Sequence, residues 1–171
     1  MGKIILITGG ARSGKSALAL KLAERDSGVV FVATAEALDS EMKKRISLHK
    51  KSRPVSWHVI EEPRDLKSAL KKIPSDTETV IIDCLTLWVS NKMLSGAKEK
   101  DILLSAKDIL ILAKKIKATC VFISNEVGSG IVPENKLARD FRDVAGRVNQ
   151  LVSQEADKVY VSFCGLQLCL K

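Results

Sequence analysis

Short apolar runs rich in β-branched residues alternate along the chain with longer segments of helical periodicity. The runs predicted to be strands span residues 3–8, 28–34, 79–83 and 118–125. Helical spacing marks residues 15–26, 38–50, 65–72, 99–117 and 135–155. Two last runs, at 158–165 and 166–171, predict a terminal hairpin that turns around Gly165. This alternation is typical of an α/β fold with a mainly parallel sheet covered by helices on both faces.

The length favours one domain over two. A chain of 171 residues, 46% of them hydrophobic, can bury a sizeable core but is short for two ordinary domains. No repeat or low-complexity linker divides it. We therefore expect residues 1–171 to form a single catalytic domain.

The net charge alone does not identify a binding partner. A formal charge of +8 could attract nucleic acid, an anionic membrane or phosphorylated small molecules. The basic residues are scattered in twos and threes, and aromatic residues, which stack on bases, are only 4% of the chain. We expect a polyphosphate-binding cleft and no nucleic acid partner.

The cysteines and the N-terminus bear on location. The four cysteines include no Cys-x-x-Cys pair, and several lie in apolar runs, which predicts buried thiols in a reducing compartment. The first residues enter a strand directly, without a cleavage-site pattern, and no apolar run is as long as a membrane span. The expected location is the cytoplasm.

A glycine-rich loop carries the clearest chemistry. The run from Gly9 to Ser16 fits G-x-x-x-x-G-K-[ST], directly after a predicted strand and before a predicted helix. Such a P-loop holds phosphates on its backbone N–H groups and on the helix N-terminus. Lys15 would reach the β- and γ-phosphate oxygens, and Ser16 would bind Mg²⁺. The predicted phosphate-binding residues are Gly9, Gly10, Ala11, Arg12, Ser13, Gly14, Lys15 and Ser16.

An acidic residue at the end of a neighbouring strand often provides the second metal contact in P-loop proteins. Asp83 ends the apolar run at 79–83 and fits that role. The alternative is a structural acid that ends the strand or begins a helix.

The segment after the second predicted strand contains an unusual histidine. Leu38, Met42, Arg45 and His49 share one face of the helix predicted at 38–50, which Pro54 ends. Cations surround His49 and could gather phosphate oxygens around a nucleophile. The residues alone favour a histidine at the end of a helix near a basic surface over a nucleophile.

Several segments together resemble a known family. They are "TGGARSGKS", "RISLHKKSRPVSW", "DCLTLWVSN" and, above all, "SNEVGSGIVPENKLARDFRDVAGRVNQ". They occur in order over nearly the whole chain and are similar to the bifunctional adenosylcobinamide kinase / adenosylcobinamide-phosphate guanylyltransferases of cobalamin biosynthesis. The resemblance implies a RecA-like P-loop NTPase fold.

The resemblance also implies two reactions. A nucleoside triphosphate, ATP or GTP, phosphorylates the aminopropanol hydroxyl of adenosylcobinamide. GTP then guanylylates a histidine, and the GMP passes to the corrinoid phosphate, giving adenosylcobinamide-GDP. The implied cofactor is Mg²⁺, and the implied assembly is a homotrimer.

Carried onto this sequence, the resemblance makes His49 the guanylylated nucleophile and Lys15 a catalytic partner. Glu61 would read the guanine edge, and Asp83 would join Ser16 at the metal. The further nucleotide-binding residues implied are Ala33, Thr34, Ala35, Lys50, Lys51, Ser52 and Arg53. One departure is that some relatives have a second histidine where this chain has Leu48.

Two roles fit the loop at 125–133. It follows the carboxyl end of a predicted strand, where ligands bind in open α/β sheets, so it either faces the corrinoid or forms a rigid turn between subunits. Further along, Arg139 and Asp143 have the spacing of an exposed ion pair. Arg142, Arg147 and Asn149 could contact phosphate or another subunit.

Three functional hypotheses remain. The first is the bifunctional enzyme, and the second is a kinase without guanylyl transfer. The third is a nucleotide-gated module that uses its positive charge to bind nucleic acid. Only the first predicts that α-labelled GTP labels the protein, and the third predicts binding that weakens steeply with salt.

Overall fold

A computed structural model describes residues 2–37, 39–51 and 53–171, together with every side chain in those ranges except that of Arg45. The strands are Lys3–Gly9 (β1), Val29–Ala33 (β2), His58–Glu61 (β3), Thr79–Asp83 (β4), Thr119–Ile123 (β5), Lys158–Phe163 (β6) and Leu166–Cys169 (β7). The helices are Lys15–Ala23 (α1), Ser40–Lys51 (α2), Leu66–Lys71 (α3), Leu85–Leu94 (α4), Glu99–Lys115 (α5) and Lys136–Glu155 (α6). Among the described residues, no helix combines the length and apolarity needed to cross a bilayer.

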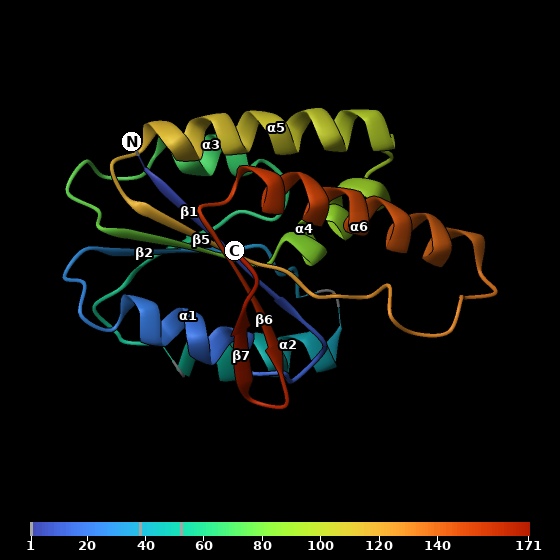
Figure 1. The fold of residues 1–171 in the computed structure, drawn as a ribbon, viewed down its shortest axis with the longest axis horizontal. Helices are drawn as coiled ribbons and strands as arrows, with labels where there is room; N and C mark the ends of the chain where they lie inside the picture. Colours follow the sequence, from blue (N-terminus) through green and yellow to red (C-terminus); the bar gives the residue numbers. More distant parts are fainter. Residues whose placement is uncertain (1, 38, 52) are drawn as a thin grey trace.

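The described strands form one sheet in the order β3-β2-β4-β5-β1-β6-β7. All neighbours pair in parallel except β6 and β7, which form the antiparallel terminal hairpin. Helices α1 and α2 lie on one side of the sheet, and α3 to α6 lie on the other (Figure 1). The predicted fold class, a mainly parallel sheet with helices on both faces and a C-terminal hairpin, is confirmed.

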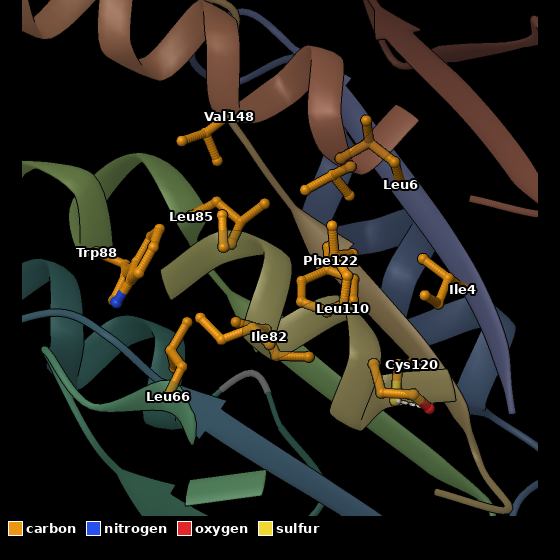
Figure 2. Packing of buried hydrophobic residues seen from close by; sticks show 14 of the residues in the cluster. Ile4, Leu6, Leu66, Ile82, Leu85, Trp88, Leu110, Cys120, Phe122 and Val148 are labelled. Carbon is orange, nitrogen blue, oxygen red and sulfur yellow. Dashed lines mark hydrogen bonds between the residues drawn. The ribbon is translucent and has the colours of Figure 1, made fainter. Parts of the chain in front are cut away.

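Two hydrophobic clusters, one on each side, hold the sheet between the helices. The larger surrounds Trp88 and Phe122, neither of which is exposed to solvent (Figure 2). The central strands β4 and β5 are buried on both faces, which explains their unbroken runs of Val, Ile and Phe. Helix α6 is amphipathic and buries Val144, Val148 and Val152 at helical spacing.

Parallel strands end at the same edge, and this places the chemistry-bearing residues together. The carboxyl ends of β1, β2, β3 and β4 carry the P-loop, Ala33, Glu61 and Asp83. The hairpin turn also lies at this edge, because β6 runs parallel to β1 and pairs with it. The Gly165 N–H donates to the Ser13 carbonyl at 3.0 Å, so the hairpin turn rests on the P-loop.

Two elements and two cysteines differ from the sequence predictions. Strand β3 and helix α4 were not among the predicted elements. Cys84 and Cys120 are buried, and burial raises the pKa of each thiol to about 12. The prediction of buried thiols is wrong for Cys164 and Cys169, which are exposed because they lie in the turn and on the edge strand of the hairpin.

Candidate active site

The P-loop joins β1 to α1 through backbone conformations that few side chains tolerate. Gly9 has φ 145° and Gly14 has φ 101°, both in the range that favours glycine. A Cβ atom at Gly9 would lie 2.2 Å from the carbonyl oxygen of Ser162, so the neighbouring strand also excludes a side chain there. These glycines let the loop close tightly at the start of α1, the arrangement that binds phosphate at a helix N-terminus.

Lys15 lies inside this loop. Its ammonium group donates to the carbonyl oxygens of Gly9, at 2.9 Å, and Gly10, at 2.5 Å. Burial lowers the pKa of Lys15, and the negative charge of Asp83 opposes that shift. The ammonium group is thus fixed at the centre of the loop, where the motif places the β- and γ-phosphates.

Asp83 and Ser16 meet at the carboxyl end of β4. Burial raises the pKa of the Asp83 carboxyl, while the charges of His49, Arg53 and Lys15 and a hydrogen bond with the Ser16 side chain oppose the rise. A hydroxyl and a carboxylate beside a P-loop are hard oxygen ligands. They fit Mg²⁺, which proteins usually hold through one or two carboxylates together with substrate phosphates.

His49 lies beside this pair. It lines a pocket of about 10 Å³ together with Ser16, Asp83 and Arg53. That volume is about the space of one water molecule. The structure therefore brings the predicted nucleophile to the predicted metal ligands, a proximity that sequence spacing alone did not reveal.

Arg53 links His49 to the sheet. Its guanidinium lies 4.1 Å from the centre of the Phe31 ring, a cation–π contact with β2. Its Nε donates to the His49 carbonyl at 2.9 Å. The buried Nη1 of Arg53 has no hydrogen-bond partner within the described part of the chain. This contact is tertiary, and nothing in the sequence motif predicted it.

Glu61 lies at the opposite end of the sheet edge. Four strand spacings separate β3 from β1, about 19 Å along the sheet. The Glu61 carboxylate contacts Lys50 at 2.6 Å, and both side chains are mostly exposed. The P-loop, Asp83 and Glu61 thus follow one another along the edge.

Thr34 has a different role from its neighbours in the predicted nucleotide site. Its side chain is fully buried, donates to the Cys84 carbonyl at 2.8 Å and accepts from the Cys84 N–H at 2.6 Å. Its carbonyl accepts from the Asn91 amide at 2.8 Å. The Thr34 hydroxyl therefore fixes the chain beside Asp83.

The structure describes some of the other predicted site residues, and the rest lie outside the described residues. Ala33 and Ala35 flank Thr34 at the end of β2, and Lys51 is exposed at the end of α2. Leu38 and Ser52 lie outside the described residues, as does the side chain of Arg45. Of the four residues predicted to share one face of this helix, the structure describes the side chains of Met42, which is half-buried, and His49.

The predicted ion pair between Arg139 and Asp143 is wrong. The Arg139 guanidinium donates to the carbonyls of Pro133 and Glu134, and Asp143 contacts Arg142 at 3.0 Å. Arg147 pairs with Glu99. The Asn149 amide donates to the Asn125 carbonyl at 3.5 Å, so α6 supports the start of the loop at 125–133.

Comparison with known proteins agrees with this geometry. The family described as cobinamide kinase / cobinamide phosphate guanyltransferase matches residues 5–170. A bifunctional adenosylcobalamin biosynthesis protein CobU from Escherichia coli (strain K12) is 36% identical, with 98% of this chain and 99% of that protein covered. The CobU protein of Salmonella typhimurium is 37% identical over the same shares.

A fold-level likeness extends further. A KaiC-like protein from Pyrococcus horikoshii OT3 superposes with a TM-score of 0.55 at 15% identity, covering 94% of this chain and 70% of that one. This likeness supports the P-loop NTPase fold alone.

Proposed function

Because the chain belongs to the cobinamide kinase / cobinamide phosphate guanyltransferase family, we propose that it performs both reactions in that name at one nucleotide site. The acceptor is adenosylcobinamide in the first reaction and its phosphate in the second. The donors are ATP or GTP for phosphorylation and GTP for guanylyl transfer. The observation that carries the proposal is the pocket that His49 shares with Ser16 and Asp83.

In the kinase step the P-loop holds the β- and γ-phosphates. The acceptor hydroxyl oxygen attacks the γ-phosphorus, and the bond from that phosphorus to the leaving nucleoside diphosphate breaks. Lys15 is already desolvated and directed into the loop, so it can stabilise the charge that develops on the transferred group. No covalent intermediate on the protein is needed.

In the guanylyl step an imidazole nitrogen of His49 attacks the α-phosphorus of GTP, and pyrophosphate leaves. A phosphate oxygen of the corrinoid phosphate then attacks the same phosphorus and breaks the phosphorus–nitrogen bond. Two displacements suit a weakly nucleophilic phosphate acceptor. Arg53, whose Nε holds the His49 carbonyl, keeps this end of α2 close to the P-loop.

Ser16 and Asp83 would hold Mg²⁺. When bound there, the ion would neutralise charge on the phosphate oxygens. The cations around Asp83 favour its ionised form, which is the form that binds a metal.

Glu61 would select guanine, because a carboxylate accepts hydrogen bonds from the N1–H and amino groups of guanine and adenine offers no such pair. Lys50, which pairs with Glu61, would hold the carboxylate in place. Ala33, Ala35, Lys51 and Ser52 complete the proposed nucleotide site, with Thr34 acting through Cys84.

The remaining features belong to the same proposal: one domain, a cytoplasmic location, a homotrimer and no nucleic acid partner. The edge strand β7 exposes Leu166, Leu168 and a following Leu170, each more than half accessible, which supports an oligomer. Light scattering, which measures the mass of the assembly in solution, should give the mass of three chains if the protein is a homotrimer.

Substitution of the two histidines tests the proposal. His49→Ala should abolish formation of adenosylcobinamide-GDP and keep measurable kinase activity, because phosphoryl transfer needs no imidazole nucleophile. His58→Ala is the matched control, since His58 begins β3 outside the pocket, and it should keep both activities. Guanylyl transfer by His49→Ala would refute the covalent role. A wild type that only phosphorylates would favour the kinase hypothesis.

A further inference from the structure

Glu126 lies directly beside the P-loop, although it is 110 residues or more from it in sequence and belongs to no part of the predicted nucleotide site. After β5 ends, the chain runs beside the end of β1 and the start of the P-loop. The Ser124 N–H donates to the Ile7 carbonyl at 2.9 Å, and the Glu126 N–H donates to the Gly9 carbonyl at 2.9 Å. Between them, the Asn125 N–H donates to the Thr86 hydroxyl at 2.6 Å. Hydrogen bonds from three consecutive backbone N–H groups therefore fix the position of Glu126.

The Glu126 carboxylate is oriented as well as placed. Its Oε1 accepts from the Gly128 N–H at 2.6 Å. A Cβ atom at position 128 would lie 2.8 Å from that oxygen, so a side chain there would displace the carboxylate. Glycine at position 128 allows the backbone to hold one oxygen while the exposed carboxylate keeps the other for a further partner.

Glu126 and Lys15 share one acceptor. The same Gly9 carbonyl that accepts from the Glu126 N–H accepts from the Lys15 ammonium group at 2.9 Å. Lys15 marks where the γ-phosphate would lie. The backbone of Glu126 therefore lies at the rim of the predicted γ-phosphate position, and Glu126 is not among the residues that line the pocket with His49.

We propose that Glu126 is a catalytic residue of the kinase step, where its carboxylate accepts the proton of the acceptor hydroxyl. This proposal rests on the proposed function. The hydroxyl oxygen forms the new bond to the γ-phosphorus, the bond to the nucleoside diphosphate breaks, and the hydroxyl proton moves to Glu126. General base assistance of this kind contributes about 10²–10⁴-fold to a rate.

The other two carboxylates of the predicted site, those of Asp83 and Glu61, already have interaction partners. Asp83 is buried, hydrogen-bonded to Ser16 and surrounded by cations. Glu61 pairs with Lys50 at the far end of the sheet edge. The guanylyl step needs no base of this kind, because its acceptor is a phosphate oxygen without a proton to lose at neutral pH. Glu126 should therefore serve one of the two reactions only.

Glu126→Gln tests this assignment, because the amide oxygen can still accept from the Gly128 N–H while the side chain can no longer take a proton. In a single-turnover assay with γ-labelled ATP and adenosylcobinamide, we expect the rate to fall by about 10²-fold or more. Labelling of the protein by α-labelled GTP, and GMP transfer to supplied adenosylcobinamide phosphate, should stay at wild-type rates. Gly128→Ala should slow the kinase step selectively as well.

Glu134→Gln is the matched control, an exposed glutamate near the same loop, and it should keep both rates. A Glu126→Gln kinase rate within about threefold of wild type would overturn the proposal. Equal loss of kinase rate and GTP labelling would overturn it too, because that result indicates a distorted P-loop. Failure of the wild type to label with α-labelled GTP would contradict the covalent role of His49 instead, and the kinase comparison would still decide on Glu126.

Discussion

Thr34→Val should destabilise the protein without altering its surface. The Thr34 hydroxyl is buried and exchanges two hydrogen bonds with the backbone of Cys84, at 2.8 and 2.6 Å. Valine has nearly the same shape and no hydroxyl, so the Cys84 N–H would lose its buried partner, while the Cys84 carbonyl would still accept from the Trp88 N–H at 3.1 Å.

The size of the effect follows from the unpaired Cys84 N–H. A buried polar group left unsatisfied costs about 1–3 kcal/mol, which predicts a loss of about 1–3 kcal/mol in the free energy of unfolding. For a domain of this size the melting temperature should fall by about 2–12 °C. Thr34→Ser keeps the hydroxyl, and its loss of one methyl group should cost about 1 kcal/mol.

Urea unfolding followed by circular dichroism measures both variants against the wild type. If the free energy of unfolding of Thr34→Val lay within about 0.5 kcal/mol of the wild-type value, the structural role of the Thr34 hydroxyl would be refuted. If stability were unchanged and the KM for GTP rose about tenfold, Thr34 would contact the nucleotide directly, as the family resemblance first implied.

Two other substitutions test the nucleotide site. Lys15→Ala should lower both activities by about 10²-fold or more, because both use the phosphates held in the P-loop, and steady-state assays of each reaction would show whether one survives. Glu61→Gln should raise the KM for GTP far more than the KM for ATP, and an equal change for both nucleotides would show that Glu61 does not read the base.

The features predicted well from sequence are those encoded locally. The P-loop is contiguous, and Gly9 and Gly14 have the positive φ angles that favour glycine. The buried strands β4 and β5 are continuous apolar runs, and α6 has clear helical periodicity. The local sequence alone was therefore enough to predict these elements.

Helix α4 and strand β3 were missed for physical reasons. Helix α4 follows β4 after a single residue, and the Cys84 thiol, an unusual cap, accepts from the Leu87 N–H at its start. Its sequence is apolar on several faces, because α4 is packed inside the larger cluster, so the polar stripe typical of a surface helix is weak. Strand β3 has four residues and is mostly exposed.

The site could be predicted only where one motif contained it. The bonds from Thr34 to Cys84 and from Glu126 to Gly9 join residues far apart in sequence. The approach of His49 to Ser16 likewise depends on how α2 packs, through Arg53 on Phe31, and not on any local pattern. Such contacts follow from strand order, which the local pattern leaves open.

The central claim is that His49 becomes covalently guanylylated at the P-loop site, and labelling with GTP tests it most directly. Wild-type protein incubated with Mg²⁺ and α-labelled GTP should retain label that acid releases and alkali does not, as expected for phosphorus bonded to an imidazole nitrogen. Label from γ-labelled GTP should not remain, because the γ-phosphate leaves in pyrophosphate. Peptide mapping should place the label on His49, and His49→Ala should carry none. Persistent label on His49→Ala, or label mapped to another residue, would contradict the account.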